Sequence, residues 1–357
     1  MQIVAINTYL EKLPLVQPYR IAYQHIEDTE IIYLEIILAN GIIGYGAANP
    51  FAEVTGETPA TTLSLLKSAV VENLIGKDIS DFNTLIDSCA QHFAAFPGAL
   101  AAVDLALHDA YCKYYNMPVY ALYGQARPHL PTSITIGIKP VKEMLVDALA
   151  YYEKGFRVLK LKTGTSVDDD INIVQKLNEQ FGASVKIRVD ANLGYTLTDL
   201  NKFIDSTSHC ALELIEQPLP VGDEHVLLTL PDTIRKKLVA DESLTGYSSA
   251  EQLVKMPQPF GVFNIKLMKA GGIKAAKKIA DLAKENNIQL FWGCNDESLI
   301  SIVAALHIAY ACSNTKYLDL DGSIEILENN FTGGFTIKNG LMYLADGYGL
   351  GVSKREK

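Results

Sequence analysis

A barrel of parallel strands and helices, preceded by a smaller α+β domain, is the fold that this sequence of 357 residues predicts. Eight short runs of strand-forming residues recur between residues 133 and 321, and helical stretches separate them. Such alternation is typical of a parallel sheet, and eight units suffice to close the sheet into a barrel. Five runs end in a charged residue, with gaps of 28, 26, 25 and 25 residues; these residues are Lys162, Asp190, Glu216, Asp241 and Lys266.

The first part of the chain predicts an α+β unit. Residues 2–13 and 31–39 have the composition of strands, and the Asn-Gly turn after the second run indicates a hairpin. Over residues 59–115 the apolar positions are three and four apart, and the segment ALAAVDLALHDAYCKYY predicts a well-buried helix. We therefore expect a capping domain over residues 1–125.

Residues 126–325 carry the barrel pattern. Its helical stretches include SVDDDINIVQKLNEQFG and KAAKKIADLAKENN, and the second ends in lysine and asparagine, as helix C-termini often do. The implied fold is a modified TIM barrel of the (β/α)7β type, whose active site lies at the carboxyl ends of the strands. The expected strands are SITIG (133–137), RVLKLK (157–162), VKIRVD (185–190), LELIE (212–216), LVADE (238–242), GVFNIK (261–266), IQLFWG (288–293) and KYLDLD (316–321).

The last segment, residues 326–357, contains a second hairpin signal. Its stretch GGFTIKNGLMYLADGYGLG places an Asn-Gly turn between two strand-like runs. We expect this segment to return to the N-terminal sheet of the capping domain.

The composition argues against several classes of protein. A net charge of −10 at pH 7 disfavours nucleic-acid binding, which needs a basic surface. The sequence has no apolar run of the ~18 residues that a membrane span requires, and no secretory signal is evident. Five widely spaced cysteines without a CxxC pair predict reduced thiols rather than disulfides or a zinc site. We therefore expect a cytoplasmic protein with no membrane or nucleic-acid partner.

Three carboxylates end successive strands of the predicted barrel, namely Asp190, Glu216 and Asp241. Each alone could be a helix cap or a solvated loop residue, but matching positions on neighbouring strands bring the three side chains together. Three like charges at close range repel one another and therefore call for a cation. Hard oxygen ligands without histidine or cysteine favour Mg²⁺, with Mn²⁺ as the alternative, over zinc.

Lysines flank this triplet on both sides. Strand alternation in VLKLKTG places Lys160 and Lys162 on one face, and Lys266 ends the sixth strand. A substrate carboxylate on the metal would have its α-carbon between Lys162 and Lys266. One lysine can then remove the α-proton while the other returns a proton to the opposite face. We expect the nearby cation and partial burial to lower the pKa of these lysines.

Several motifs together carry a family resemblance: KLK (160–162), DAN (190–192), EQP (216–218), ADES (240–243), NIKLMKAGG (264–272) and DLDG (319–322). With these motifs the whole chain resembles the enolase superfamily, in the muconate-lactonizing-enzyme subgroup, and its dipeptide epimerases most closely. In that superfamily a lysine or histidine base acts together with Mg²⁺, which stabilises an ene-diolate. The resemblance therefore implies an isomerase with Lys162 and Lys266 as bases and one Mg²⁺ per subunit.

The DLDG motif points to dipeptides as substrates. In the resembled family, a pair such as Asp319 and Asp321 holds the free ammonium of the N-terminal residue of the dipeptide, which suits their charge. The metal would bind the C-terminal carboxylate, and a two-base 1,1-proton transfer would invert the α-carbon of the C-terminal residue. Lys160 would help to neutralise the ene-diolate, and Asn192 would lie behind the metal ligands.

Preference for particular side chains is expected to come from two loops of the capping domain. Where relatives that act on Ala-Glu tend to carry an arginine, this chain has Gln24. Glu53 and Asp296 are acidic residues near the expected pocket, and Thr135 is a further expected substrate-binding residue. A negative pocket favours cationic side chains, so a basic dipeptide is the expected substrate and Ala-Glu the alternative.

Two other functions stay open at this point. A lyase or cycloisomerase of the same superfamily, making o-succinylbenzoate or a muconolactone, would use the same metal and lysines, but its substrate has no ammonium for the two aspartates. A non-catalytic barrel that only binds a metal or a partner would require the loss of a ligand or base, and all five are present. We expect a small-molecule substrate and a homo-oligomeric assembly.

Overall fold

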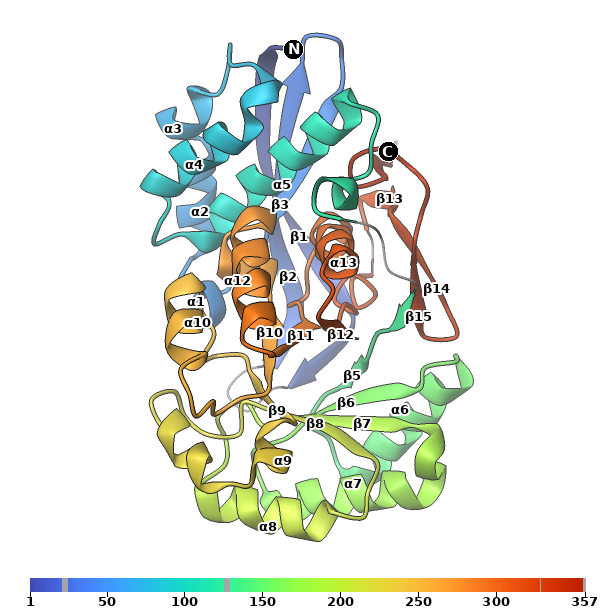
Figure 1. Ribbon diagram of the computed structural model, residues 1–357. Helices are drawn as coiled ribbons and strands as arrows, with labels where there is room; N and C mark the ends of the chain where they lie inside the picture. The colour runs from blue at the N-terminus through green and yellow to red at the C-terminus, as the bar shows by residue number, and fades with distance from the viewer. Residues whose placement is uncertain (21–24, 125–128, 328, 356–357) are drawn as a thin grey trace.

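The computed structural model describes residues 1–20, 25–124, 129–327 and 329–355. Most helices of the N-terminal third of the chain gather at one end of the molecule, and the first three helices of the barrel lie at the opposite end (Figure 1). None of the described helices combines the length and the apolar content needed to cross a bilayer.

The N-terminal sheet has longer strands than predicted. Strands β1 (Ile3–Arg20), β2 (His25–Leu38) and β3 (Ile43–Ala48) form an antiparallel sheet in that order. The β1–β2 pairing continues to the last residue of β1 and the first residue of β2. This ribbon runs from the capping domain down to the barrel, as Figure 1 shows in blue, so it carries N-terminal residues to the barrel strands.

Helices of the capping domain cover this sheet. The most buried of them is the alanine-rich helix that the sequence predicted. A Cβ atom on Gly46 would lie 1.9 Å from the carbonyl oxygen of Ala102, so glycine lets the sheet approach this helix closely. The elements are α1 (Ala52–Thr55), α2 (Pro59–Leu66), α3 (Ala69–Glu72), η1 (Ile79–Asp81), α4 (Phe82–His92), α5 (Pro97–Tyr114) and η2 (Val119–Leu122).

Eight parallel strands form the barrel, as predicted. They follow one another in chain order, and a parallel bridge between Thr132 and Leu318 joins the first strand to the last. Ser133 closes the same seam by donating its backbone N–H to the Leu318 carbonyl at 3.0 Å. The strands are β5 (Ile134–Ile136), β6 (Val158–Lys162), β7 (Lys186–Asp190), β8 (Leu212–Glu216), β9 (Leu238–Ala240), β10 (Val262–Ile265), β11 (Gln289–Trp292) and β12 (Thr315–Leu318).

Helices separate the barrel strands. The two that were predicted from SVDDDINIVQKLNEQFG and KAAKKIADLAKENN are both present, as α7 and α12. Ser166 caps the first of these, α7, by accepting a hydrogen bond from the Asp169 N–H at 3.3 Å. Asp104 of α5 caps the second, α12, by accepting from the Ile273 N–H at 2.7 Å, which ties the capping domain to the barrel. The barrel helices are α6 (Val141–Glu153), α7 (Val167–Phe181), η3 (Gly182–Ser184), α8 (Leu197–Thr207), η4 (Glu224–Thr229), α9 (Asp232–Arg235), α10 (Tyr247–Leu253), α11 (Leu267–Ala270), α12 (Ile273–Glu285) and α13 (Leu299–Ala311).

Five barrel strands end earlier than predicted, and three of them stop before an expected site residue. Strands β9, β10 and β12 stop before Asp241, Lys266 and Asp319, so these residues lie in the loops that follow. At Asp241 and Lys266 the backbone leaves the sheet because other groups take its hydrogen bonds. The N–H of Asp241 donates to the side-chain oxygen of Gln217, and Lys266 is the N-cap residue of α11.

The tail returns to the N-terminal sheet, where Ile326 forms an antiparallel bridge with Leu15 of β1. Strands β13 (Phe331–Gly333) and β16 (Val352–Lys354) pair with each other. Strands β14 (Phe335–Lys338) and β15 (Leu341–Leu344) form the predicted hairpin. Strand β15 pairs with β4 (Leu130–Pro131), which directly precedes the first barrel strand in the chain.

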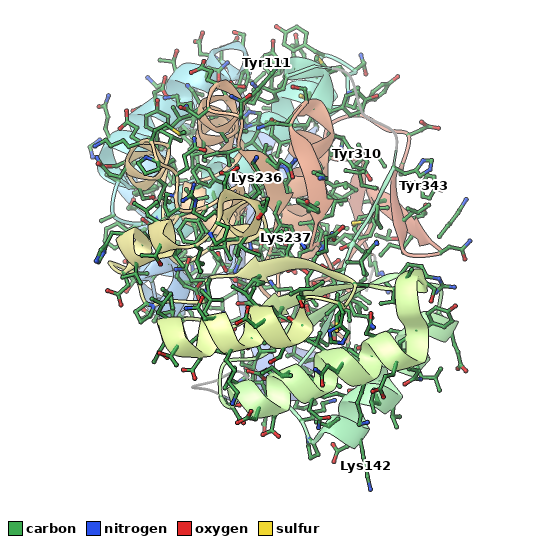
Figure 2. All side chains as sticks on the ribbon, turned by 60° about the horizontal axis from the view of Figure 1, so that its bottom comes forward. Tyr111, Lys142, Lys236, Lys237, Tyr310 and Tyr343 are labelled. Atoms are coloured by element: carbon green, nitrogen blue, oxygen red, sulfur yellow. The ribbon has the colours of Figure 1, made fainter. Side chains whose placement is uncertain are left out.

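Backbone pairing and side-chain contacts both connect the tail to the rest of the protein. The Phe331 ring lies 5.2 Å from that of Tyr33, and Lys354 forms an ion pair with Glu35 at 2.7 Å. Figure 2 labels Tyr310 on α13, whose hydroxyl donates to a carbonyl of β15 at 2.6 Å. The tail therefore packs on both the N-terminal sheet and the barrel, and the expected domain boundaries stay predictions.

Candidate active site

A cavity of about 430 Å³ lies at the carboxyl ends of the barrel strands. Barrel residues form its floor, and β2 together with residues 49–59 of the capping domain forms part of its side. Thr29 of β2 connects the two parts, because its hydroxyl donates to the backbone carbonyl of Asp296 at 2.9 Å. The position of the cavity is the one that a barrel of this type predicts for an active site.

The three predicted metal ligands meet beneath this cavity. One oxygen from each of Asp190, Glu216 and Asp241 lies within 4.8 Å of the other two, and the residues are 0, 2 and 3 % exposed. Asp190 and Glu216 are direct partners in the register of β7 and β8, which explains their proximity. Three carboxylate oxygens are the donors that Mg²⁺ prefers, so the residues present fit this ion.

The pKa values of the triplet reflect the crowding of like charges. Burial raises the pKa of Glu216, and Asp190 raises it further, to about 8. Burial acts on Asp190 as well, but the amines of Lys162 and Lys160 outweigh it and lower that pKa to about 2. One carboxyl of the pair thus tends to keep a proton, a conflict that a bound divalent cation would relieve.

Lys160 lies among the carboxylates at the bottom of the cavity. We call these carboxylates the floor; they are Asp190, Glu216, Asp241 and Asp319. Its Nζ atom is 2.9 Å from Asp319, 2.8 Å from Glu216 and 3.1 Å from Asp190. Burial by itself would lower the pKa of Lys160, but these carboxylates raise it well above its ordinary value. Lys160 is therefore held as a cation.

Lys162 and Lys266 approach the triplet from different strands. Lys162 Nζ is 2.8 Å from Asp190 Oδ2, and Lys266 Nζ is 2.8 Å from Asp241 Oδ2. Strands β7, β8 and β9 separate β6 from the strand that precedes Lys266. The lower pKa predicted for the lysines is wrong for Lys266 in this structure. Burial lowers its pKa, but the Asp241 carboxylate outweighs burial and raises it.

Sequence reasoning missed three residues that hold the floor in place. Lys269 contacts the carboxylate of Asp241, and Gln217 accepts a hydrogen bond from the Asp241 N–H at 3.1 Å. Asn264 donates to Glu216 Oε1 at 2.8 Å. All three lie within the motifs EQP and NIKLMKAGG, and the available signal was a polar side chain in an otherwise apolar run.

Asp319 and Asp321 differ in their partners. Asp319 accepts hydrogen bonds from Lys160 at 2.9 Å and from the Ser133 hydroxyl at 2.5 Å. Asp321 accepts from the backbone N–H of Thr135 at 2.8 Å, and no lysine or arginine of the described chain pairs with it. Burial, followed by the charges of Asp319 and Glu325, raises the pKa of Asp321 to about 8.

Further acidic groups extend from Asp321 along the cavity. We call Asp147, Asp296, Asp321 and Glu325 the acidic wall, since all four line the cavity. Burial and then the charge of Asp296 raise the pKa of Glu325 to about 7. Lys139 forms an ion pair with Asp147 at 2.7 Å. Sequence reasoning found only two members of this wall, Asp296 and Asp321.

The remaining predicted residues fall into two groups. Thr135 and Asn192 line the cavity, and Asn192 Oδ1 accepts a hydrogen bond from Lys162 at 3.3 Å. Gln24 lies outside the described residues. Glu53 lies on α1, at the edge of the capping domain that borders the cavity.

Comparison with known sequences gives matches along nearly the whole chain. A model of the mandelate racemase / muconate lactonizing enzyme N-terminal domain matches residues 4–124, and one described as enolase C-terminal domain-like matches residues 143–357. An L-Lys-D/L-Arg epimerase of Desulforapulum autotrophicum is 44% identical over 354 residues, which are 99% of this chain and 100% of that protein.

Solved structures with the same fold include enzymes with bound dipeptides. A dipeptide epimerase from Methylococcus capsulatus, complexed with Mg and L-Arg-D-Lys, matches with a TM-score of 0.96 and 41% identity over 99% of both chains. One from Enterococcus faecalis, complexed with Mg and L-Leu-L-Tyr, matches with a TM-score of 0.92 and 32% identity over 99% of this chain and 100% of that chain. The present chain therefore belongs to the mandelate racemase / muconate lactonizing enzyme family of the enolase superfamily.

Proposed function

We propose that this protein is a Mg²⁺-dependent dipeptide epimerase that inverts the α-carbon of the C-terminal residue and prefers cationic dipeptides. The observation that carries the proposal is one cavity in which Lys162 and Lys266 flank an acidic triplet and an acidic wall lies beside them. The names of the relatives agree with it, since two of those at 41–44% identity are L-Lys-D/L-Arg epimerases.

The acidic triplet would hold the metal ion. Mg²⁺, when bound, supplies positive charge that stabilises the substrate carboxylate as it becomes an ene-diolate. If the ion engaged Asp241, the attraction of this carboxylate for Lys266 would be weaker, and the pKa of that amine would fall toward the range that a base requires. The two neighbouring carboxyls whose pKa values are driven apart, Asp190 and Glu216, support this assignment.

Lys162 and Lys266 would exchange the proton at the α-carbon. One neutral amine takes the α-proton, and the electrons of the broken C–H bond enter the ene-diolate. The ammonium on the other side then gives a proton to the opposite face of the carbon, which inverts it. Lys160, held as a cation among carboxylates, adds positive charge near the developing oxyanion.

The acidic wall would bind the cations of the substrate. Asp321 accepts the N-terminal ammonium, because its carboxylate faces the cavity with no lysine or arginine partner among the described residues. Asp296 and Glu325 lie beside it and suit a cationic side chain. Both alternatives fit less well. A glutamate side chain would be repelled by this wall, and the substrates of the related lyases carry no ammonium for Asp321.

A library of L,L-dipeptides, incubated with the protein and Mg²⁺ in deuterium oxide and followed by mass spectrometry, tests the proposal. We expect the fastest label uptake in the C-terminal residue of dipeptides that contain lysine or arginine. Chelation with EDTA should stop the uptake and added Mg²⁺ should restore it. Absence of label in every dipeptide, or a preference for Ala-Glu, would contradict the proposal. The cytoplasmic location and the homo-oligomeric state stay predictions.

A further inference from the structure

The two base lysines are held in different ways. Lys266 Nζ lies 2.8 Å from Asp241 Oδ2, so a carboxylate holds it directly. Lys162 Nζ lies 2.8 Å from Asp190 Oδ2 and 3.3 Å from the amide oxygen Oδ1 of Asn192. A neutral amine has two hydrogens and one lone pair, so two fixed acceptors also fix the direction of the lone pair.

The orientation of the Asn192 amide depends on Glu242. The Asn192 backbone has φ +41°, in the left-handed region that asparagine tolerates, and its N–H donates to Asp190 Oδ1 at 3.1 Å. The side-chain Nδ2 donates to Glu242 Oε1 at 3.1 Å. An amide has one donor end and one acceptor end, so placing Nδ2 on Glu242 turns Oδ1 toward Lys162.

Only one oxygen of the Glu242 carboxylate has a hydrogen-bond partner among the described residues. It follows the metal ligand Asp241 and lines the cavity. Its second oxygen, Oε2, is buried and has no hydrogen-bond partner in the part of the chain that the structure describes. A buried oxygen without a partner costs about 1–3 kcal/mol, so stability alone does not account for a glutamate at this position.

We propose that Glu242 is a positioning residue for one half of the reaction, because through Asn192 it sets the direction of the Lys162 amine. The inference rests on the proposed two-base function. The hydrogen-bond relay does not reach Lys266, which senses Glu242 only through charge. Loss of the relay should therefore affect proton transfer on the side of the α-carbon that Lys162 faces, and spare the other side.

Deuterium uptake at the α-carbon, measured for each dipeptide epimer separately, tests this role. Lys162→Ala identifies the epimer whose exchange depends on Lys162. Glu242→Ala should slow the exchange of that epimer about tenfold and leave exchange of the other within about twofold. Glu242→Gln keeps an oxygen that can accept from Asn192 but removes the charge, so it should restore most of the rate.

The same relay predicts coupling between its two members. Asn192→Ala should slow the same epimer, and the double variant with Glu242→Ala should be no slower than either single variant. Asn192→Ala also provides the test if Glu242→Ala does not fold. Glu251→Ala, at an exposed position of α10, is the matched control.

Three results would overturn the role of Glu242. Equal slowing of both epimers, or a Glu242→Gln variant as slow as Glu242→Ala, would mean that Glu242 acts through its charge. A weaker Mg²⁺ affinity of Glu242→Ala, measured by calorimetry, would mean that it acts through Asp241. A wild-type protein that exchanges neither epimer would instead refute the proposed function itself.

Discussion

The floor and the acidic wall of the cavity are both rich in carboxylates, but they treat charge differently. On the floor, each carboxylate lies against an amine; for example, Lys160 contacts three of them at 2.8–3.1 Å. On the wall, Asp321 and Glu325 face other carboxylates, and burial with this repulsion raises their pKa values to about 8 and about 7. The floor is thus organised before substrate binds, whereas Asp321 on the wall has no lysine or arginine partner in the described part of the chain and could receive a cation from the substrate.

Loss of either lysine should have the largest effect, because the proposed reaction takes place between these two side chains at the floor. Lys162→Ala and Lys266→Ala should each lower the rate of epimerisation by about 10³-fold or more, measured by polarimetry or by chiral chromatography. Lys142→Ala is the control, since Lys142 points away from the protein (Figure 2). Epimerisation by either variant at close to the wild-type rate would refute the two-base role.

A change on the wall should act on binding rather than on chemistry. Asp321→Asn removes the charge that is proposed to pair with the N-terminal ammonium, so we expect KM to rise about 10- to 100-fold with a smaller change in kcat. Steady-state kinetics with a Lys-Arg dipeptide measure both constants, and the exposed Asp205→Asn is the matched control. An unchanged KM would show that the ammonium binds elsewhere.

The pH dependence should separate the wall from the floor. Asp321 must be ionised to pair with an ammonium, and its pKa of about 8 in the free protein means that it is mostly protonated at pH 7. As pH falls below 8, kcat/KM should therefore fall about tenfold per pH unit. Above pH 8 the substrate amine, with an ordinary pKa of about 7.7–8.0, loses its proton. The acidic limb should flatten in Asp321→Asn, and persistence of that limb would assign it to another group.

A milder change on the wall should alter selectivity. Glu325→Gln keeps the shape of the side chain but removes one negative charge from the cavity, so the ratio of kcat/KM for a cationic dipeptide to that for a neutral one should fall about three- to tenfold. Glu251→Gln, on the exposed face of α10, should leave the ratio unchanged. A higher ratio in Glu325→Gln would place the cationic side chain elsewhere.

The smallest expected effect is on stability without substrate. The pKa of Asp321 is raised in the folded protein, so the unfolded chain loses this proton at lower pH, and Asp321 destabilises the fold increasingly as pH rises from about 4 to about 8. Asp321→Asn should therefore raise Tm more at pH 8.5 than at pH 5.5, by about 2–4 °C per kcal/mol relieved. A rise that does not depend on pH would point to a cause other than ionisation.

Most of the fold and the floor could be predicted because the signal is local and repeats. Strands with similar spacing end at similar depths of a barrel, so Asp190 and Glu216 are register partners on neighbouring strands. The strand ends were harder to predict. The backbone beyond Ala240 turns away because Gln217, 24 residues earlier than Asp241, takes the hydrogen bond that would extend the sheet.

Pairing between distant segments could not be predicted from the sequence. Asp319 and Asp321 look equivalent in DLDG, yet Lys160, separated from Asp319 by 159 positions, engages only the first. Asn192 and Glu242 are 50 residues apart, and their hydrogen bond depends on how two loops meet. The sequence shows which residues are charged, but it does not show which of them form pairs, because the pairs form only in the folded chain.

Deuterium exchange in the two single-lysine variants asks whether the amines lie on opposite sides of the α-carbon. Lys162→Ala and Lys266→Ala are each incubated with one dipeptide epimer at a time in deuterium oxide with Mg²⁺. Each variant should still exchange the α-hydrogen of one epimer without inverting it, and the epimer retained by one should be the epimer lost by the other. Retention of the same epimer by both variants would place the two lysines on one side and contradict the proposed reaction.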